Sequence, residues 1–447
     1  MIQNFILQPI FLLLITFFGY LVVNLISPQV KYIEKISLSF IIGLGLYTFV
    51  IFISNWLFGT PIKISPIIAI LAWLVMTAIY LNLCFKRKNI FPFQINNWSK
   101  RTLRWTLGLS KFEKILFLIL VFIFGSLLLS NLYWPIWSWD AVALFDFRAR
   151  QILSFGQILG SFDLTPGSYP LLTSLAHVLV YIVGGKNPQY LYFLFLLSPS
   201  IIFYLFLRRF MERSHSLISL ILLTSLPLVT VQTQSALTDL PQSAFLLTGF
   251  IYLILGLHDD KKYYVVLSGL LFSLSMWARN EPFWMLAMLV LFIFSFKRKW
   301  FILDGVFLAT IYAISYPWTN FIKTNAVPLV YAADQLDTHN IPLTNPMFWV
   351  VMPEFIFKNI IFPVWPFFLA FLLLLVIRRK NLTEIVKLIT FSIFIILTFL
   401  VVGTSMFVIT YPQWPALYNS LQRMLIFLYA LLIADTSLLL FPTKSEL

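Results

Sequence analysis

Residues 115–134 read ILFLILVFIFGSLLLSNLYW, an unbroken stretch without a charged side chain. An α-helix rises about 1.5 Å per residue, so a stretch of this length spans the hydrocarbon core of a bilayer, which is about 30 Å thick. It begins directly after Lys114 and ends at Trp134, and tryptophan is enriched where a membrane meets water. The stretch is therefore predicted to be a transmembrane helix.

Similar apolar stretches recur along the whole chain. Its 447 residues are 60% apolar and 11% charged, with a mean hydropathy of +0.91. A soluble domain carries about a quarter of its residues as charges, so the chain is predicted to be an all-α, polytopic membrane protein. We expect about thirteen transmembrane helices from the length that a span requires. The predicted spans are residues 5–26, 37–58, 64–85, 115–134, 190–207, 217–233, 240–257, 264–278, 282–296, 301–318, 360–377, 388–408 and 421–440.

The charged residues and the single cysteine exclude other classes. A net charge of +14 would suggest a nucleic-acid partner for a soluble protein, but here the basic residues lie in short segments between apolar stretches. Their placement therefore indicates orientation in the membrane, and no nucleic-acid partner is expected. Because Cys84 is the only cysteine, an intrachain disulfide is excluded. Residues 5–26 are too long for a signal-peptide core, so we expect a retained span.

The apolar run 170–183 is left out of the spans because its length is that of a re-entrant or interfacial helix. Without it, most of the 31 lysines and arginines share one side of the membrane, as the positive-inside rule requires of the cytoplasmic side. The N-terminus is then predicted outside and the C-terminus in the cytoplasm. Two long loops, 135–189 and 319–359, are predicted on the outer face.

Acidic residues gather on this predicted outer face. Asp140, Asp239 and Glu281 lie near span ends at three separate points in the chain. An ionisable group at that depth is costly unless it lines an aqueous cavity or is paired, so each is a candidate functional residue. Each also has a structural alternative. Asp140 and Asp239 can cap the helices that begin beside them, and the helix dipole favours Glu281 just before the helix expected at residue 282.

The segment 138–153, SWDAVALFDFRARQIL, is predicted to be a helix that lies along the membrane surface. Its apolar residues recur at helical spacing: Val142, Phe145, Ala149 and Ile152. Asp146 and Arg150 are four residues apart and can form a local ion pair. Asp140 begins this segment among three tryptophans that hold it at headgroup depth, so we favour a functional role for it over capping. His177, in the run 170–183, is predicted to be a packed core residue.

These motifs, in this order, resemble the GT-C superfamily of membrane glycosyltransferases, and most closely its Rgt-type and protein O-mannosyltransferase branch. The likeness is carried by WSWDAVALFDFRARQILSFG (137–156), YPLL (169–172), RRF (208–210), TDLP (238–241) and GLLFSLSMWARNEPFW (269–284). Many relatives carry an Asp-Glu doublet where this chain has Asp140 and Ala141, so either Asp140 or Asp146 can fill the catalytic position. The usual Tyr-Pro-Pro is Tyr169, Pro170 and Leu171 here.

The resemblance implies a fold in three parts. Residues 1–114 would hold additional N-terminal transmembrane helices and a basic cytoplasmic loop, and 115–318 the GT-C-like catalytic module with outer loop 135–189. Residues 319–447 would supply outer loop 319–359 and the C-terminal helices. The basic loop, residues 86–114, mixes cationic and aromatic side chains, and we expect it to lie on anionic lipid headgroups.

The resemblance also implies a reaction. A sugar would pass with inversion from a polyprenyl-phosphate donor to a hydroxyl of a glycan, lipid or protein acceptor on the outer face. Asp140 would act as the general base, with Asp146 as the substitute. The departing phosphate needs a guanidinium, for which Arg279 is favoured. Secondary choices for the phosphate are Arg148, Arg150, Lys323 and Arg423.

Asp239, Glu281 and Tyr169 are expected to bind substrate. Arg279 has a structural alternative, an ion pair with Glu281 or Asp239. No metal or other cofactor is expected, although Asp140, Asp239 and Glu281 offer oxygen ligands suited to Mg²⁺ or Mn²⁺.

Two other readings remain open. A transporter or flippase of a lipid-linked saccharide would more naturally have repeated halves and polar residues at mid-membrane, whereas most acidic residues here lie at predicted outer ends. A ligase or polymerase of the O-antigen type would favour an outer loop rich in arginine and histidine. Residues 319–359 contain one histidine and no arginine.

Overall fold

The computed structural model describes residues 2–87, 108–163, 165, 169–327, 353–354, 357–361, 364–410 and 422–441. Every regular element within these ranges is helical, so the all-α class predicted from composition is confirmed. Most of the basic loop 86–114 and much of the outer loop 319–359 lie outside the described residues. The predicted contact of the basic loop with lipid headgroups therefore stays a prediction.

The N-terminal helices form a closely packed pair with a third helix beside it. Their bounds are Ile2–Ile26 for α1, Tyr32–Phe58 for α2, Ile62–Ile64 for the short turn η1 and Ser65–Arg87 for α3. Gly19 and Gly43 lie where α1 and α2 meet, and a Cβ atom on Gly19 would lie 1.9 Å from the backbone oxygen of Ser39. Only glycine allows this approach, in the way that small residues bring membrane helices together.

The opening stretch forms α5 (Lys111–Tyr133), which begins with a capping box. The Ser110 hydroxyl accepts from the Glu113 amide, and the Glu113 carboxylate accepts from the Ser110 amide at 2.8 Å. The predicted outer loop 135–189 follows. It contains η2 (Ala141–Asp146), α6 (Phe147–Phe155), η3 (Leu159–Asp163) and α7 (Leu172–Ile182).

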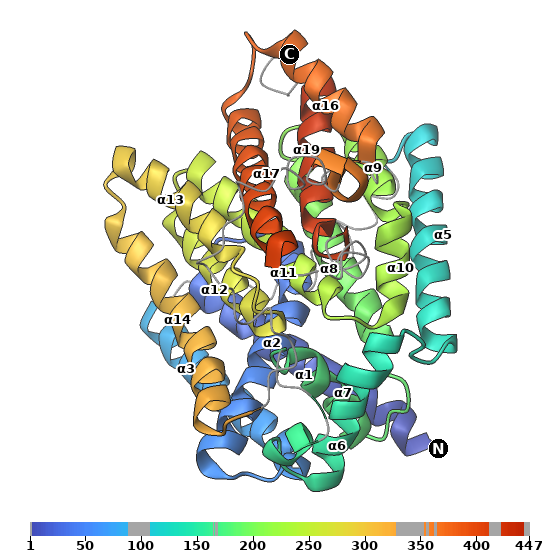
Figure 1. Ribbon diagram of the computed structural model, residues 1–447, viewed down its shortest axis with the longest axis vertical. Helices are drawn as coiled ribbons and strands as arrows, with labels where there is room; N and C mark the ends of the chain where they lie inside the picture. The colour runs from blue at the N-terminus through green and yellow to red at the C-terminus, as the bar shows by residue number, and fades with distance from the viewer. Residues whose placement is uncertain are drawn as a thin grey trace.

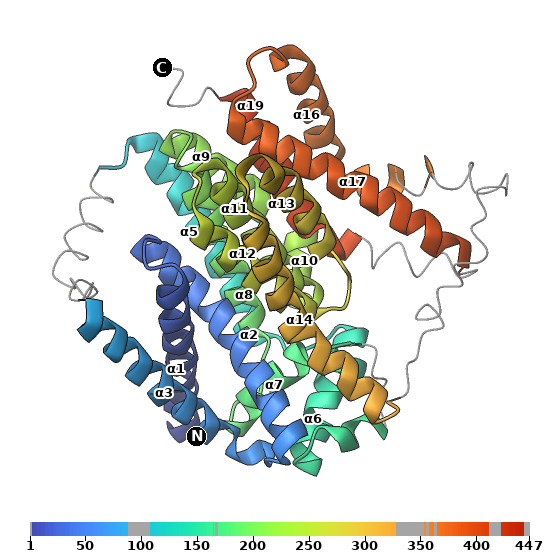
Figure 2. The ribbon, with the colours of Figure 1, turned by 90° about the vertical axis from the view of Figure 1, so that its left-hand side faces the viewer.

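This loop leaves and rejoins the bundle at the same end. After α7, the Asn187 side-chain amide donates to the backbone oxygen of Trp134 at 2.8 Å, directly beyond the end of α5. The helix α7 therefore does not cross the bundle, in agreement with the exclusion of 170–183 from the spans. Both views place α6 and α7 at one end of the molecule, where α1 begins, with α16 at the other end (Figures 1 and 2).

The remaining helices complete the bundle. They are Tyr190–Leu207 for α8, Arg213–Thr224 for α9, Pro227–Ser235 for α10, Asp239–His258 for α11, Lys262–Ala278 for α12, Trp284–Arg298 for α13 and Phe301–Thr324 for α14. The C-terminal elements are Phe357–Ile361 for η5, Trp365–Arg378 for α16, Glu384–Thr410 for α17 and Ile426–Leu440 for α19. The helix α11 is the central one, because nearly all its residues are buried.

Seven helices in the described residues are long and apolar enough to cross a membrane, or eight if α9 and α10, which meet at 59°, form one bent span. The chain is therefore a membrane-embedded helical protein. The count of thirteen, the orientation of the termini and the GT-C module stay predictions, as does the division into three parts. The N-terminal helices are packed into the bundle, since Trp277 of α12 donates to the Thr48 hydroxyl of α2 at 3.0 Å.

Candidate functional site

A buried arginine connects two of the predicted acidic residues. The Arg279 guanidinium forms an ion pair with Asp239. It forms a second ion pair with Glu281, whose Oε1 lies 2.6 Å from Nη2 and accepts a hydrogen bond from Nε at 2.7 Å. These two carboxylates hold the pKa of Arg279 above its ordinary value in spite of burial, which acts in the opposite direction. The ion pair proposed as the structural alternative for Arg279 is therefore present with both partners.

Arg423 extends this group to the loop between α5 and α8. Its Nη1 lies 3.5 Å from Asp140 Oδ2, and its Nε lies 3.8 Å from Asp239 Oδ2. The ion pairs thus run without a break from Asp140 through Arg423, Asp239 and Arg279 to Glu281. We call these five residues the rim network. The structure brings together the three carboxylates that the sequence placed at separate span ends, with Arg423, a secondary choice, as the connecting residue.

Backbone contacts explain why Asp239 and Arg279 meet. Asp239 is the first residue of α11, and Arg279 directly follows the last residue of α12. The Thr238 hydroxyl donates to the Ala278 backbone oxygen at 2.8 Å, which holds the start of one helix against the end of the other. Just before this point Ala236 has a positive φ of 55°, a conformation that costs energy for a residue with a Cβ. The Thr238 hydrogen bond thus holds the turn into α11 against the end of α12.

The capping roles considered for the carboxylates are not observed. Asp140 stands at the cap position of η2 without a side-chain capping hydrogen bond. At the start of α11 the cap residue is Thr238, again without such a bond, and Asp239 is already helical. The helix α13 begins at Trp284 rather than at Pro282. The carboxylates of Asp140 and Asp239 are instead engaged with arginines.

Tyr169 lies against the rim network. The Arg279 guanidinium carbon lies 5.3 Å from the centre of the Tyr169 ring, a cation–π distance. The segment that carries Tyr169 is held by Arg148, which is fully buried. Arg148 donates to the Tyr169 backbone oxygen and to the Thr165 hydroxyl, both at 3.2 Å. Arg148 therefore positions Tyr169 from within the loop.

Asp146 belongs to a second, separate cluster. It accepts from Arg150 at 2.8 Å and from the Tyr181 hydroxyl, and His177 Nδ1 lies 3.3 Å away. Burial opposes ionisation of Asp146, but these contacts outweigh it and lower the pKa of Asp146 to about 2. The local pair with Arg150 is confirmed, and so is the buried position of His177, which also contacts the Tyr192 hydroxyl at 2.9 Å. Asp146 and Arg150 make no recorded polar contact with the rim network in the described residues.

Gln242 is a site residue beyond those predicted from the sequence. It lies three residues after Asp239 on the same face of α11, and its amide nitrogen donates to Glu281 Oε2 at 2.9 Å. The spacing in TDLPQ could have indicated it, because residues three apart on a helix are neighbours. Lys323, a secondary choice for the phosphate, is exposed near the end of α14.

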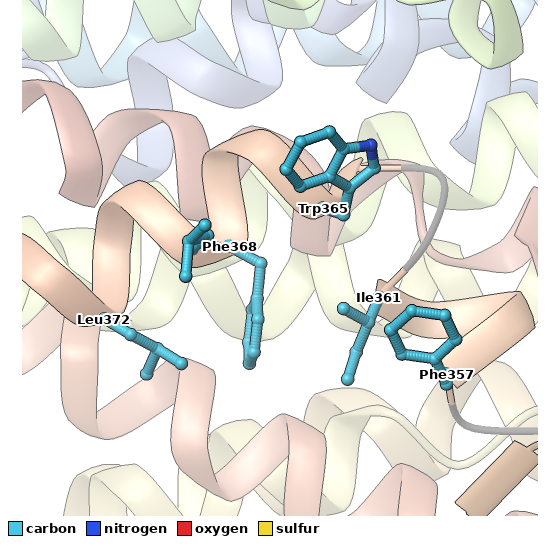
Figure 3. Close-up of a pocket in the computed structure, with 6 residues that line it drawn as sticks. Phe357, Ile361, Trp365, Phe368 and Leu372 are labelled. Carbon is cyan, nitrogen blue, oxygen red and sulfur yellow. The ribbon is translucent and has the colours of Figure 1, made fainter.

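The described residues also form an apolar pocket of about 370 Å³ between η5 and α16 (Figure 3). Its lining residues are Phe357, Ile361, Trp365, Phe368, Leu369 and Leu372. None of them belongs to the rim network, and none offers an acid, a base or a charge. The pocket suits a hydrocarbon chain, and the polar chemistry lies elsewhere.

Within the described ranges, no group of three or more histidine, cysteine, aspartate or glutamate side chains is arranged to hold a metal ion. Comparison of the chain with models of known families, with curated proteins and with solved structures gives no match. The interpretation of the site therefore depends on the geometry of its own residues.

Proposed function

We propose that the protein is a membrane glycosyltransferase, which moves a sugar from a polyprenyl-phosphate donor to an acceptor hydroxyl on the outer face. The observation that carries the proposal is the rim network. It joins carboxylates and arginines that lie at or beside the ends of apolar helices, among them the long helix α11, next to the loop between α5 and α8. A donor whose tail stays in the bilayer presents its sugar at this depth.

Asp140 is the better base of the two aspartates. Its side chain is 47% exposed and makes the longer contact of 3.5 Å with Arg423, so an acceptor hydroxyl can reach it. The Asp146 side chain is 9% exposed and is engaged by three partners. Its pKa of about 2 also makes it a poor proton acceptor, because general bases work best with a pKa near the operating pH. In this mechanism Asp146 holds the loop and Asp140 takes the proton.

Arg423 is a better phosphate partner than Arg279. The rim network contains three carboxylates and two guanidinium groups, so a phosphate has to take a guanidinium away from a carboxylate. Arg279 is bound by Asp239 and by Glu281, the latter at 2.6 Å, which makes this exchange costly. The contacts of Arg423 with Asp140 and Asp239 are 3.5 and 3.8 Å. Transfer of Arg423 to the phosphate would also release Asp140 to act as the base.

Asp239, Glu281 and Tyr169 would bind the saccharide. Carboxylates accept hydrogen bonds from sugar hydroxyls, and an aromatic ring beside them packs on the apolar face of a sugar. Arg279 holds all three in place, through two ion pairs and the cation–π contact. The role of Arg279 is thus to position the binding groups, and not to bind the phosphate.

The proposal is tested with purified full-length protein in liposomes that contain a polyprenyl-phosphate sugar labelled in the sugar. The expected result is loss of labelled donor together with a new glycosidic bond on an added acceptor, chosen from oligosaccharide, glycolipid and peptide pools. Movement of intact labelled lipid between leaflets, without a new bond, would contradict the proposal and favour the transporter reading. If the donor stays intact and in its original leaflet with every acceptor pool, both the glycosyltransferase proposal and the transporter reading are contradicted.

A further inference from the structure

Gln242 closes a ring of polar contacts with three members of the rim network, Asp239, Arg279 and Glu281. Asp239 and Gln242 lie one turn apart on α11, Arg279 connects Asp239 to Glu281, and Glu281 accepts from the Gln242 amide nitrogen at 2.9 Å. The backbone of this turn is itself fixed, since the backbone N–H of Gln242 donates to the backbone oxygen of Thr238 at 3.0 Å. The position of Gln242 on the first turn of α11 is therefore set by the helix.

The hydrogen bond with Glu281 fixes which way the side-chain amide of Gln242 points. An ionised carboxylate only accepts hydrogen bonds, so the nitrogen of Gln242 must face Glu281 and the oxygen must face away from it. Gln242 is fully buried, and its Oε1 has no hydrogen-bond partner among the described residues. A buried acceptor without a donor loses the hydrogen bonds that it would make with water. Most buried polar groups in proteins are satisfied by other protein groups, by water or by a ligand.

The surroundings indicate what kind of donor would satisfy it. Glu281 and Asp239, its neighbours in the ring, carry acceptor oxygens, and the one cationic donor among the four residues, Arg279, is engaged by both carboxylates. A hydroxyl, which donates one hydrogen bond and carries no charge, matches the unpaired oxygen.

We propose that Gln242 Oε1 accepts a hydrogen bond from one hydroxyl of the bound saccharide and makes the site selective for sugars that carry this hydroxyl. This inference rests on the proposed function, which it deepens by naming a selectivity residue. The substrate class is a sugar with a free hydroxyl at the recognised carbon. The corresponding deoxy or O-methyl sugar leaves Oε1 buried and unpaired, which is how a polar site rejects an analogue without the hydroxyl.

The test pairs removal of the hydroxyl from the ligand with removal of the amide from the protein. Full-length protein in nanodiscs is titrated with methyl glucoside, methyl galactoside and methyl mannoside, and with their single deoxy derivatives, and affinities are taken from ligand NMR. The unmodified chain is expected to bind one deoxy derivative of the preferred sugar about three- to tenfold more weakly than the parent, the size of one neutral hydrogen bond. The Gln242→Met chain should bind the preferred sugar and its deoxy derivative with equal affinity.

The matched control is Gln232→Met in α10. Gln232 is also buried with an Oε1 that lacks a partner, but it makes no recorded hydrogen bond with the ring in the described residues. The Gln232→Met chain should keep the discrimination of the unmodified chain. Equal affinity of the unmodified chain for every deoxy derivative would overturn the inference without any variant, and would mean that water alone satisfies Oε1.

The inference and the proposed function fail in different ways. Discrimination that survives Gln242→Met would overturn the inference, and sugar transfer by the unmodified chain would still stand. Discrimination that depends on Gln242, in a chain that forms no glycosidic bond in liposomes, would support the saccharide site and leave transfer refuted.

Discussion

Arg423 and Asp140 are 283 residues apart in the sequence, and their side chains lie 3.5 Å apart in the fold. Arg423 precedes α19, the last described helix, whereas Asp140 lies directly before η2 in the loop after α5. Since Arg423 also approaches Asp239, the C-terminal part of the chain completes a site whose other members come from the loop after α5 and from α11 and α12. The rim network therefore requires these distant segments to be folded against one another.

Arg423→Gln should weaken binding of the donor phosphate. A hydrogen bond to a charged group is worth about 1.5 to 3 kcal/mol, so the affinity for polyprenyl phosphate alone should fall by roughly 10- to 100-fold. Binding to protein in nanodiscs measures this directly. Arg208→Gln is the control, because Arg208 bonds to the Met211 backbone oxygen and belongs to another part of the bundle. Equal affinity of the Arg423→Gln and unmodified chains would exclude Arg423 as the phosphate partner.

Asp239 and Arg279 should show strong energetic coupling. Asp239→Asn leaves a buried guanidinium with only Glu281 as its charged partner in the network, and losing one partner of a buried pair costs about 3 kcal/mol or more. The double variant Asp239→Asn with Arg279→Met should lose less stability than the sum of the two single variants. Thermal unfolding in detergent measures all four chains. Additive losses would show that the two side chains do not stabilise each other.

The contribution of Asp146 to stability should depend on pH. Its pKa is lowered from the ordinary value of 3.8 to about 2 in the folded chain, so the ionised carboxylate stabilises the fold above about pH 4 and loses this effect as pH falls toward 2. Asp146→Asn should therefore lower the free energy of unfolding at pH 7 by up to about 2 kcal/mol. Screening of the charge by solvent reduces this value. When unfolding is measured from pH 7 to pH 3, the difference in stability between the Asp146→Asn chain and the unmodified chain should become smaller below pH 4. A constant difference across this range would contradict the assignment.

Arg148→Lys should loosen the segment that carries Tyr169. A lysine cannot donate to the Thr165 hydroxyl and the Tyr169 backbone oxygen with the forked geometry of a guanidinium. Hydrogen exchange should increase around residues 165–172, and sugar transfer should fall because Tyr169 no longer packs on Arg279. The control is Arg150→Lys, since the Arg150 side chain is 61% exposed. Unchanged exchange in the Arg148→Lys chain would show that other contacts hold the segment.

The sequence predicted the helical class, the return of the loop at 170–183 and the meeting of Asp140, Asp239 and Glu281. These follow from composition, from the length of each apolar run and from the cost of charge in a membrane. It also predicted the pair of Asp146 with Arg150, because an i,i+4 contact depends only on local helix geometry. In the surface segment, Phe145, Ala149 and Ile152 are buried as predicted, whereas Val142 is exposed.

The remaining contacts depend on tertiary packing. His177 and Tyr181 reach Asp146 only because α7 folds back on α6, and local spacing carries no sign of this. The choice between capping and ion pairing for Asp140 and Asp239 was equally undecidable from the sequence, since both roles use the same residue types at the same positions. The pairing with Arg423 decides between them in the folded chain.

The rate of sugar transfer by the Asp140→Asn chain in liposomes, compared with Asp146→Asn at saturating donor and acceptor, tests the central claim most directly. General-base catalysis is typically worth 10²- to 10⁴-fold, so Asp140→Asn should lose about this much in rate. Its thermal stability should change little, because the Asp140 side chain is half exposed. The Asp146→Asn chain should be less stable yet retain transfer at pH 7. Full activity of Asp140→Asn would contradict the mechanism.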